Sequence, residues 1–597
     1  MRFRLGLGPV FYYEWMTTAR RWQMYAVRSL FIAVLLAALA VVWWRELAGV
    51  RTWHGLDVYA RVGSTFGTIL LTTLFALVVL VAPSVSAGAV CQDKARGPLF
   101  HLFTTDLSDT EIICGKLMAR LIPLVGLIGC SLPVMFLSTL FGGVELQPLV
   151  GSFLVLLGIA LLGCTLSLAI SVVARRTFEV MLVAFSFWAV VLLSNPIIRT
   201  FDWFMNGFVP RGTSPTASPR PAPDPDYSLL GLVLAPVTTG NVAAVRGVSG
   251  APGLSSMDIA VRVFGIMAVL SVLLLVVAIL TVRRVTLAQS GQAQRRLVPT
   301  WSALFRWRGR SWLPRPPLDW NPVLWREWQR RRATLVSSIT WTMYVLLATL
   351  LTIKAAFTRH HPTPWFTLSD AEREFPCLVN AALVAIGLLL LSVTSVTSLI
   401  DERDRGSLDV LLTTPLPSWH IIAAKWLASY RQVLPLAVFP ALLAYLLAPV
   451  RNPWPDVMRM LGLVLGYGAV ITSLGLALAT WIKQPGRALT MSVTIYVLVS
   501  ISWLPVTLLS ERLGFTGSFL SLASPFFMVR ELTNAVLYGG EIDVWDAWAS
   551  LWTAAYPWLA ACLFLVTLKT FDRCLGRLKE SRKALPEGGI RLDGGWG

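Results

Sequence analysis

Two stretches of the sequence are copies of each other: QDKARGPLFHLFTTDLSDTEIICGK at residues 92–116 and DERDRGSLDVLLTTPLPSWHIIAAK at residues 401–425. They align without a gap at an offset of 309 residues. A long-period repeat of this kind predicts two structurally similar units. The identical positions include Arg96 and Arg405, Gly97 and Gly406, Leu99 and Leu408, Leu102 and Leu411, Thr104 and Thr413, Thr105 and Thr414, Leu107 and Leu416, and Lys116 and Lys425.

The local pattern predicts a short amphipathic helix within each copy. Arg96 and Arg405 end the preceding apolar run, where a cation suits a helix C-terminus, and the glycine after each can release the chain from the helix. Leu408, Leu411 and Leu412 then form one apolar stripe at helical spacing, and the first copy matches it with Leu99, Leu102 and Phe103. A stripe this short needs a surface to lie on. We expect that surface to be the lipid headgroup layer or a cytosolic partner.

The Thr pair in each copy is expected to end the short helix, after which a second helix begins. Ser108, with Glu111 three residues later, has the pattern of a capping box, and Ser418 is the expected cap in the second copy. Lys116 and Lys425 then fall near the bilayer surface.

Outward from these loops, the composition indicates a membrane protein. Of 597 residues, 55% are apolar and 14% charged, against roughly 25% charged in soluble chains. The net charge is +19, and the Lys and Arg residues lie between apolar runs. This placement is typical of cytoplasmic loops of a membrane protein and argues against a nucleic-acid partner. The candidate spans, at about 20 residues each, are 27–44, 66–90, 117–141, 149–173, 180–198, 258–282, 336–353, 377–400, 427–448, 458–481, 488–509 and 546–568.

The twelve runs divide into two sets of six, which predicts two parallel halves with both termini in the cytoplasm, since most Lys and Arg then lie inside. The first run starts only near Val27, so no cleaved signal peptide is expected. The predicted parts are a permease unit at 1–298 with an outside proline-rich loop at 209–226, a basic linker at 299–320, a second unit at 321–572 and a basic tail at 573–597.

A second repeat precedes each set of runs. Residues 9–15 (PVFYYEW) and 322–328 (PVLWREW) match at an offset of 313. Proline at a first helical position, with Asn321 as the cap in the second copy, predicts a helix start. Its Trp, Tyr and Arg side chains suit a helix that lies flat in the headgroup layer, as an elbow before the first span.

We find no pattern for catalysis or metal binding. No GxxxxGK[ST] phosphate loop occurs. The His360–His361 pair and the acids of Asp224-Pro225-Asp226 lie in predicted outside loops, and the seven cysteines have no CxxC spacing. The central turns of the spans have no Asp or Glu, which disfavours ion coupling, and Arg120 and Arg431 can snorkel to the cytoplasmic surface.

The loop pattern after the second span, E/D-x-x-RG-x-L-x-x-L-x-TT-x-L, resembles the permease subunits of the type two ABC exporters, here as two fused units. The resemblance implies that each loop contains a coupling helix that docks on a separate ATP-hydrolysing subunit, two copies in all. The implied docking residues are Arg96, Gly97, Leu99, Leu102, Thr104, Thr105, Leu107 and Lys116 in the first copy, and Glu402, Arg405, Gly406, Leu408, Leu411, Thr413, Thr414, Leu416 and Lys425 in the second. The first copy departs with Asp93, Pro98 and His101, so the docking sites are expected to be unequal.

The resemblance also implies short re-entrant helices on the outside, near Leu234-Ala235-Pro236 and Ala523-Ser524-Pro525. The chain itself would hold no cofactor, and ATP and Mg would bind the partner subunits. We therefore expect a non-enzymatic, multi-pass permease of a bacterial cytoplasmic membrane, an exporter of unidentified substrate in contact with lipid. The alternatives are a secondary carrier with two six-helix halves and a non-transporting membrane scaffold driven by an ABC ATPase.

Overall fold

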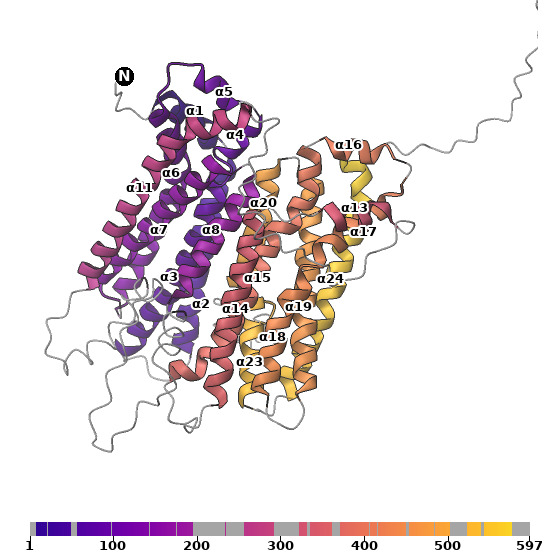
Figure 1. Ribbon diagram of the computed structural model, residues 1–597. Helices are drawn as coiled ribbons and strands as arrows, with labels where there is room; N and C mark the ends of the chain where they lie inside the picture. Colours follow the sequence, from indigo (N-terminus) through magenta and orange to yellow (C-terminus); the bar gives the residue numbers. More distant parts are fainter. Residues whose placement is uncertain are drawn as a thin grey trace, which may run out of the picture.

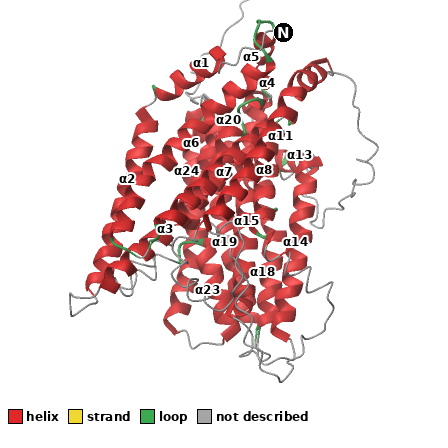
Figure 2. Ribbon diagram, turned by 90° about the vertical axis from the view of Figure 1, so that its left-hand side faces the viewer, coloured by secondary structure: helices red, strands yellow, loops and turns green. Residues whose placement is uncertain are grey.

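A computed structural model shows a bundle of long helices joined by turns and short helices (Figures 1 and 2). It describes residues 8–20, 22–48, 56–96, 98–142, 144–174, 176–194, 197, 233, 256–291, 321–330, 335–360, 370–404, 406–414, 416–448, 453–482, 484–501, 522–538 and 543–575. These ranges contain no strand, so the all-α class is confirmed for the described part of the chain. The proline-rich loop, the linker and residues 576–597 of the tail lie outside it, as do His361 and Asp224 to Asp226.

The first half of the molecule contains α1 (Gly8–Ala19), α2 (Trp22–Ala48), α3 (Leu56–Ser86), α4 (Cys91–Arg96), α5 (Pro98–Phe103), α6 (Asp109–Leu140), α7 (Leu146–Val173), α8 (Thr177–Leu192) and α11 (Ser256–Gly291). The second half contains α13 (Pro322–Arg330), α14 (Leu335–His360), α15 (Asp370–Asp404), α16 (Ser407–Leu412), α17 (Ser418–Tyr430), α18 (Val433–Leu447), α19 (Trp454–Trp481), α20 (Pro485–Ile501), α23 (Pro525–Tyr538) and α24 (Asp543–Leu575).

Nine helical stretches within the described ranges are long and apolar enough to cross a membrane. They are Tyr59–Lys94, Asp109–Leu140, Leu146–Val173, Met257–Leu287, Ser338–Phe357, Glu374–Arg403, Ser418–Leu447, Trp454–Trp481 and Ala549–Cys574. Shorter apolar helices lie at three further predicted runs: Phe31–Trp44, Thr177–Leu192 and Gly486–Ser500. The chain is therefore an integral multi-pass membrane protein, and the count of twelve spans stays a prediction.

Burial separates inner helices from outer ones. In the most apolar part of α15, 78% of the residues are buried inside the protein, against 17% in α11 and in α24. Exposed residues of α11 such as Ile266 and Val269 are apolar. A strongly apolar helix with so little protein cover fits a lipid environment. Thus α15 forms the centre of the second half, whereas α11 and α24 form outer faces.

The two halves meet along α3 and α8 on one side and α14, α15 and α20 on the other (Figure 1). Helix α8 packs against α15, and α20 packs against α3. The contact is apolar, because Val180, Met181 and Phe185 of α8 join the core of the second half. The interface therefore contains the same pairing twice: in each half, the fifth predicted span packs against the second predicted span of the other half.

The repeated loops lie at one end of the bundle, together with α1 (Figure 1). Their short helices are α4 and α5 in the first half and α16 in the second. We call this end of the bundle the loop end. The predicted run 427–448 is broken at Arg431 and Gln432 between α17 and α18. Pro435 explains the break, because it has no N–H to donate to the Arg431 carbonyl.

A short helix, α23, begins at Pro525, as the resemblance implies, and packs on α15 and α20. Its 14 residues are too few to cross a membrane. The corresponding expectation for Leu234 to Pro236 falls outside the described residues.

Candidate functional site

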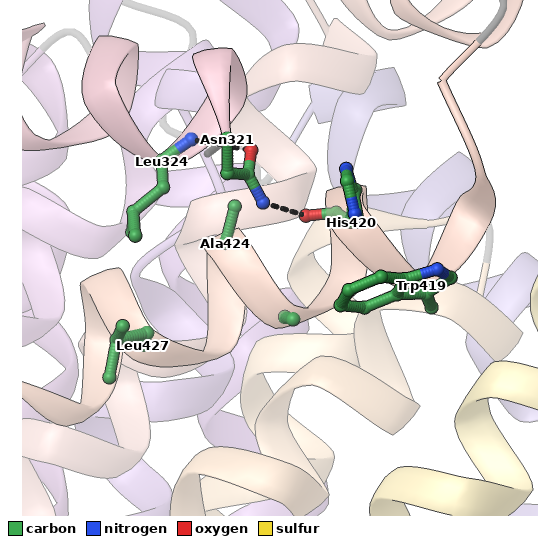
Figure 3. Close-up of a pocket in the computed structure, with 7 residues that line it drawn as sticks. Asn321, Leu324, Trp419, His420, Ala424 and Leu427 are labelled. Atoms are coloured by element: carbon green, nitrogen blue, oxygen red, sulfur yellow. Dashed lines mark hydrogen bonds between the residues drawn. The ribbon is translucent and has the colours of Figure 1, made fainter. Parts of the chain in front are cut away.

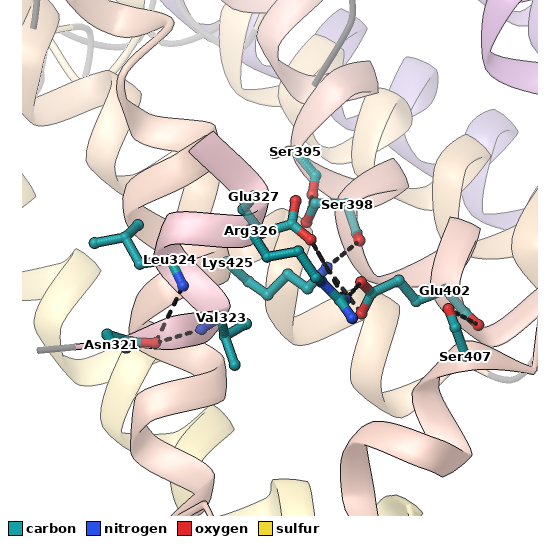
Figure 4. A network of polar contacts seen from close by, with 10 residues as sticks. All are labelled: Asn321, Val323, Leu324, Arg326, Glu327, Ser395, Ser398, Glu402, Ser407 and Lys425. Carbon is teal, nitrogen blue, oxygen red and sulfur yellow. Dashed lines mark hydrogen bonds and ion pairs between the residues drawn. The ribbon is translucent and has the colours of Figure 1, made fainter. Parts of the chain in front are cut away.

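A buried lysine connects three helices at the loop end of the second half. The Lys425 side chain, on α17, is 1% exposed, and its Nζ lies 2.8 Å from Glu327 Oε1 of α13 and 2.9 Å from Glu402 Oε2 of α15. Nζ also donates to the Ser398 carbonyl at 3.1 Å. Figure 4 shows these side chains converging from the three helices. A buried ammonium needs such partners, because desolvation without them is costly.

The first half has the same arrangement at the repeat-related positions. The Lys116 side chain, on α6, is 2% exposed, and its Nζ lies 2.8 Å from Glu14 Oε1 of α1 and forms a second ion pair with Asp93 of α4. We call each set the charge cluster: Glu14, Asp93 and Lys116 in the first half, and Glu327, Glu402 and Lys425 in the second. In both halves the charge cluster ties the elbow-sequence helix to both sides of the repeated loop.

An arginine also pairs with each charge cluster, but it comes from a different element in each half. In the first half, Arg120 of α6 lies 3.4 Å from Glu14 Oε2. In the second, Arg326 of α13 forms an ion pair with Glu402. Two carboxylates therefore face two cations in each half, which keeps the buried charge balanced.

The snorkelling of Arg120 and Arg431 to the cytoplasmic surface stays a prediction, and the structure adds a partner for each side chain. Arg120 pairs with Glu14 of α1. The Arg431 guanidinium lies 5.0 Å from the ring centroid of Trp328, on α13. Both arginines thus contact the elbow-sequence helix, because that helix packs over the start of the span and offers a carboxylate or an aromatic face.

Another repeated contact fixes the beginning of each loop. Lys94 donates to the carbonyls of Val172 and Ala174 at the C-terminus of α7, at 2.7 and 2.8 Å. Arg403, which is 309 positions later, donates to the Ile482 carbonyl at the end of α19 at 3.0 Å. Cations at helix C-termini satisfy orphan carbonyls and interact favourably with the helix dipole.

In the second loop the predicted short helix is α16. Gly406 precedes it with φ +68°, a left-handed conformation that glycine adopts without the penalty of a Cβ. Leu408 and Leu411 are buried against the second-half core, and Leu412 packs at its edge. The first loop is similar, since Leu99 is fully buried and Leu102, Phe103 and Leu107 pack against the same small core.

The apolar stripes therefore lie on the protein itself, which corrects the expectation of a headgroup layer or a partner. The physical reason is tertiary packing. Helices that are far apart in sequence come together beside each loop, and their apolar side chains form the surface on which the stripe packs. The buried members of the predicted docking set, Leu99, Lys116, Leu408, Leu411 and Lys425, position the loop from inside. Glu402 is buried with them, and Leu416 is partly buried.

Each Thr pair ends its short helix, as predicted, by the same bonds. Thr104 and Thr105 hydroxyls donate to the carbonyls of His101 and Leu102, both at 2.7 Å. Thr413 and Thr414 donate to the carbonyls three residues earlier, at 2.9 and 2.6 Å. Side-chain hydroxyls that bond backbone carbonyls compete with helix continuation.

The exposed surface of the loops differs between the copies. In the first loop, His101, Thr104, Thr105 and Asp106 are exposed. In the second, the exposed residues are Gly406, Asp409, Val410, Thr413, Pro417 and Trp419, and Val410 is 69% exposed. Gly97, Arg405 and the side chains of Arg96 and Pro98 lie outside what the structure describes.

The helix starts after the loops also differ. Ser108 and Glu111 form the predicted capping box of α6. In the second half Pro417 is the N-cap of α17, and Ser418 donates its hydroxyl to Asp572 of α24, so Ser418 is not the cap. Proline in place of Ser108 removes the side-chain acceptor that a capping box requires.

A cavity of about 50 Å³ lies between α13 and α17 (Figure 3). It is lined by Asn321, Leu324, Trp419, His420, Ala423, Ala424 and Leu427. Asn321 caps α13, as predicted, by accepting from the backbone N–H groups of Val323 and Leu324 at 3.0 and 3.1 Å. In the first half Glu111 replaces His420 and packs against Gly8, so a charged side chain takes the corresponding place.

Sequence reasoning singled out Lys116, Lys425 and the repeated Glu14 and Glu327, but not their contact. The available signal was the repeat itself, since an acid–acid–lysine set occurs at matching positions in both copies. Among described residues, no group of three or more His, Cys, Asp or Glu could hold a metal ion.

The second half, including its loop, matches a known protein family. Residues 322–569 match the family described as ABC-2 family transporter protein. The match begins at α13 and ends within α24, so it includes the second charge cluster and the second loop. No curated protein matches the sequence significantly. The family match is consistent with an ABC-2 type permease, a membrane component whose family domains have no ATPase site of their own.

Proposed function

We propose that this chain, whose residues 322–569 match the ABC-2 family transporter protein family, is a transmembrane subunit that contains both permease halves of a transporter powered by separate ATPase subunits. In this proposal both loops face the cytoplasm, and each receives one ATPase subunit. The twelve predicted spans act as two parallel six-helix halves that export an amphiphilic or apolar substrate. The elbow-sequence helices α1 and α13 then lie at the cytoplasmic membrane surface.

One observation carries the proposal: the charge cluster occurs in both halves, directly beneath the loop helix. Lys425 connects the end of α15 with the start of α17 through Glu402 and Lys116 connects α4 with α6 through Asp93. A force applied to the short helix therefore reaches two membrane helices and the elbow-sequence helix together. Buried ion pairs are suited to this role because breaking one leaves an uncompensated charge.

The first half lies outside the matched family segment, and the repeat supports its equal role. The same charge cluster and the same Thr-pair bonds occur there, and Lys94 bonds the C-terminus of α7 as Arg403 bonds that of α19 in the second half. Two repeat-related loops on one chain suit two copies of a partner.

The test is purification of the tagged, full-length chain from its native membranes in mild detergent, followed by mass spectrometry of bound proteins. We expect a soluble partner with a Walker motif at about two copies per chain. Val410→Asn and Thr413→Asp change the exposed surface of the second loop and should reduce its recovery. Leu140→Asn, at the opposite end of α6 and also highly exposed, is the matched control.

Absence of an ATPase, under conditions that keep other membrane complexes intact, would contradict the proposal. Transport that persists without ATP and follows an ion gradient would replace it with a secondary carrier. Equal ATPase recovery from the loop variants and the control would remove Val410 and Thr413 from the docking surface.

A further inference from the structure

One ion pair crosses between the two halves at the loop end. Arg176, the residue before α8, donates from Nη1 to Asp401 Oδ2 of α15 at 2.5 Å. The partners are 225 positions apart in sequence, and their side chains are 34% and 33% exposed. The pair therefore lies at the rim of the interface, where α8 packs on α15, with the apolar contact beside it.

Each charge is poorly placed for its own helix and well placed for the other. Arg176 is the N-cap of α8, where the partial positive charge of the helix end opposes a cation. Asp401 lies in the last turn of α15, where the partial negative charge opposes an anion. Across the interface, Arg176 meets a helix C-terminus and Asp401 meets a helix N-terminus. The contact between the halves therefore gives both residues the favourable environment that their own helices lack.

The repeat-related contact on the other side of the interface has no charge pair. Gln92 corresponds to Asp401, and it lies against Gly486 near the start of α20. A Cβ on Gly486 would lie 2.0 Å from Gln92 Nε2, so a larger residue there would require the Gln92 amide to move. Arg176 precedes α8, and the residue at the same place before α20 is the uncharged Gln484, since the helix boundaries of α7 and α19 differ by 308 positions. One side of the interface is thus closed by close packing and the other by an ion pair.

We propose that Arg176 and Asp401 form a latch that holds the two halves together at the loop end and releases when the halves separate during transport. A partly exposed ion pair suits a reversible latch, because water can solvate both charges after it opens. In the closed state the two halves are in contact at the loop end, and the apolar α8–α15 contact fixes their arrangement. The latch then determines how often the halves separate. This proposal rests on the proposed function for its place in a transport cycle, but the contact itself can be tested alone.

The test measures the separation of the two loops in the full-length protein. Spin labels are introduced through a non-natural amino acid at Thr104 and Thr413, which are exposed and repeat-related, so the native cysteines stay unlabelled. Pulsed dipolar spectroscopy then gives the distance distribution for four forms: unchanged, Arg176→Asp, Asp401→Arg, and the double swap. Each single change improves the charge at its own helix end, so loss of a helix cannot explain an effect.

We expect either single change to increase the long-distance population several-fold and the double swap to return it to the original value. The matched control is Arg459→Asp, which breaks an ion pair with Asp456 within α19 at the opposite end of the bundle, and it should leave the distribution unchanged. A double swap that shows the sum of the single effects would overturn the latch. Single changes without effect, or a control with an equal effect, would do the same.

Capture of the ATPase by the unlabelled variants separates the two proposals. If the unchanged chain binds no ATPase, the proposed function fails whatever the distances show. If ATPase binding is retained in all variants while the distances do not respond, only the latch is wrong.

Discussion

The two loop units are built on one plan but differ in how firmly the plan is enclosed. In the second half the charge cluster is nearly closed from solvent, with side chains of Lys425, Glu327 and Glu402 that are 1%, 9% and 8% exposed. In the first half Glu14 and Asp93 are 18% and 30% exposed. The first unit compensates at the next helix start with its capping box. The comparison shows that a repeated ion-pair arrangement can keep its geometry while the interactions that stabilise the surrounding helices differ between the halves.

The largest effect should come from removal of the lysine. Lys425→Met leaves two buried carboxylates without their shared cation, at a cost of about 3–5 kcal/mol. Lys116→Met should cost about half as much, because water reaches Asp93 and screens the remaining charges. The thermal midpoints of the purified variants in one detergent measure the difference. A first-half variant as damaged as the second-half one would break the comparison.

A smaller effect is expected at the two helix starts. Ser108→Ala removes the acceptor for the Glu111 backbone N–H and should destabilise the protein by about 1 kcal/mol. Pro417→Ala at the corresponding position should change stability by no more than about 0.5 kcal/mol, because no side-chain cap is lost there. Thermal midpoints again provide the measurement, and equal losses at both positions would show that the capping box carries no weight.

Transfer of the capping box would sharpen the same comparison. Pro417→Ser with His420→Glu recreates in the second half the pair found at Ser108 and Glu111, and should stabilise α17 by up to about 1 kcal/mol. Hydrogen exchange at the first backbone amides of α17 would report it directly. Unchanged exchange in a well-folded variant would indicate that Asp572, through Ser418, already fixes this helix start.

The smallest effect should come from filling the cavity between α13 and α17. Ala423→Leu adds apolar volume to this space and should raise stability by about 0.5 kcal/mol. Cys114→Leu is the repeat-related control, and we expect no gain there because Glu111 already packs against Gly8. A gain at Cys114 that equals the gain at Ala423 would show that the cavity is not the cause.

Much of the local structure followed from sequence patterns. Helical spacing, the Thr pairs, the Ser108 capping box and the Asn321 cap depend on residues a few positions apart, so local rules predict them. The misplaced cap at Ser418 arose because Asp572, 154 positions away, offers its hydroxyl a charged acceptor. The partner of Arg120 could not be predicted for a similar reason, since the carboxylate of Glu14 lies on another helix.

The sequence by itself determined that this is a helical membrane protein, that it has a repeated loop, and which loop residues recur. These properties depend on apolar length, charge placement and periodicity, all of which are written along the chain. Only the tertiary structure decided which repeated residues face inward: it buried Leu408 and Lys425, left Val410 exposed and brought Arg176 to Asp401. The physical reason is that burial and ion pairing depend on helices far apart in sequence, whose packing no local pattern records.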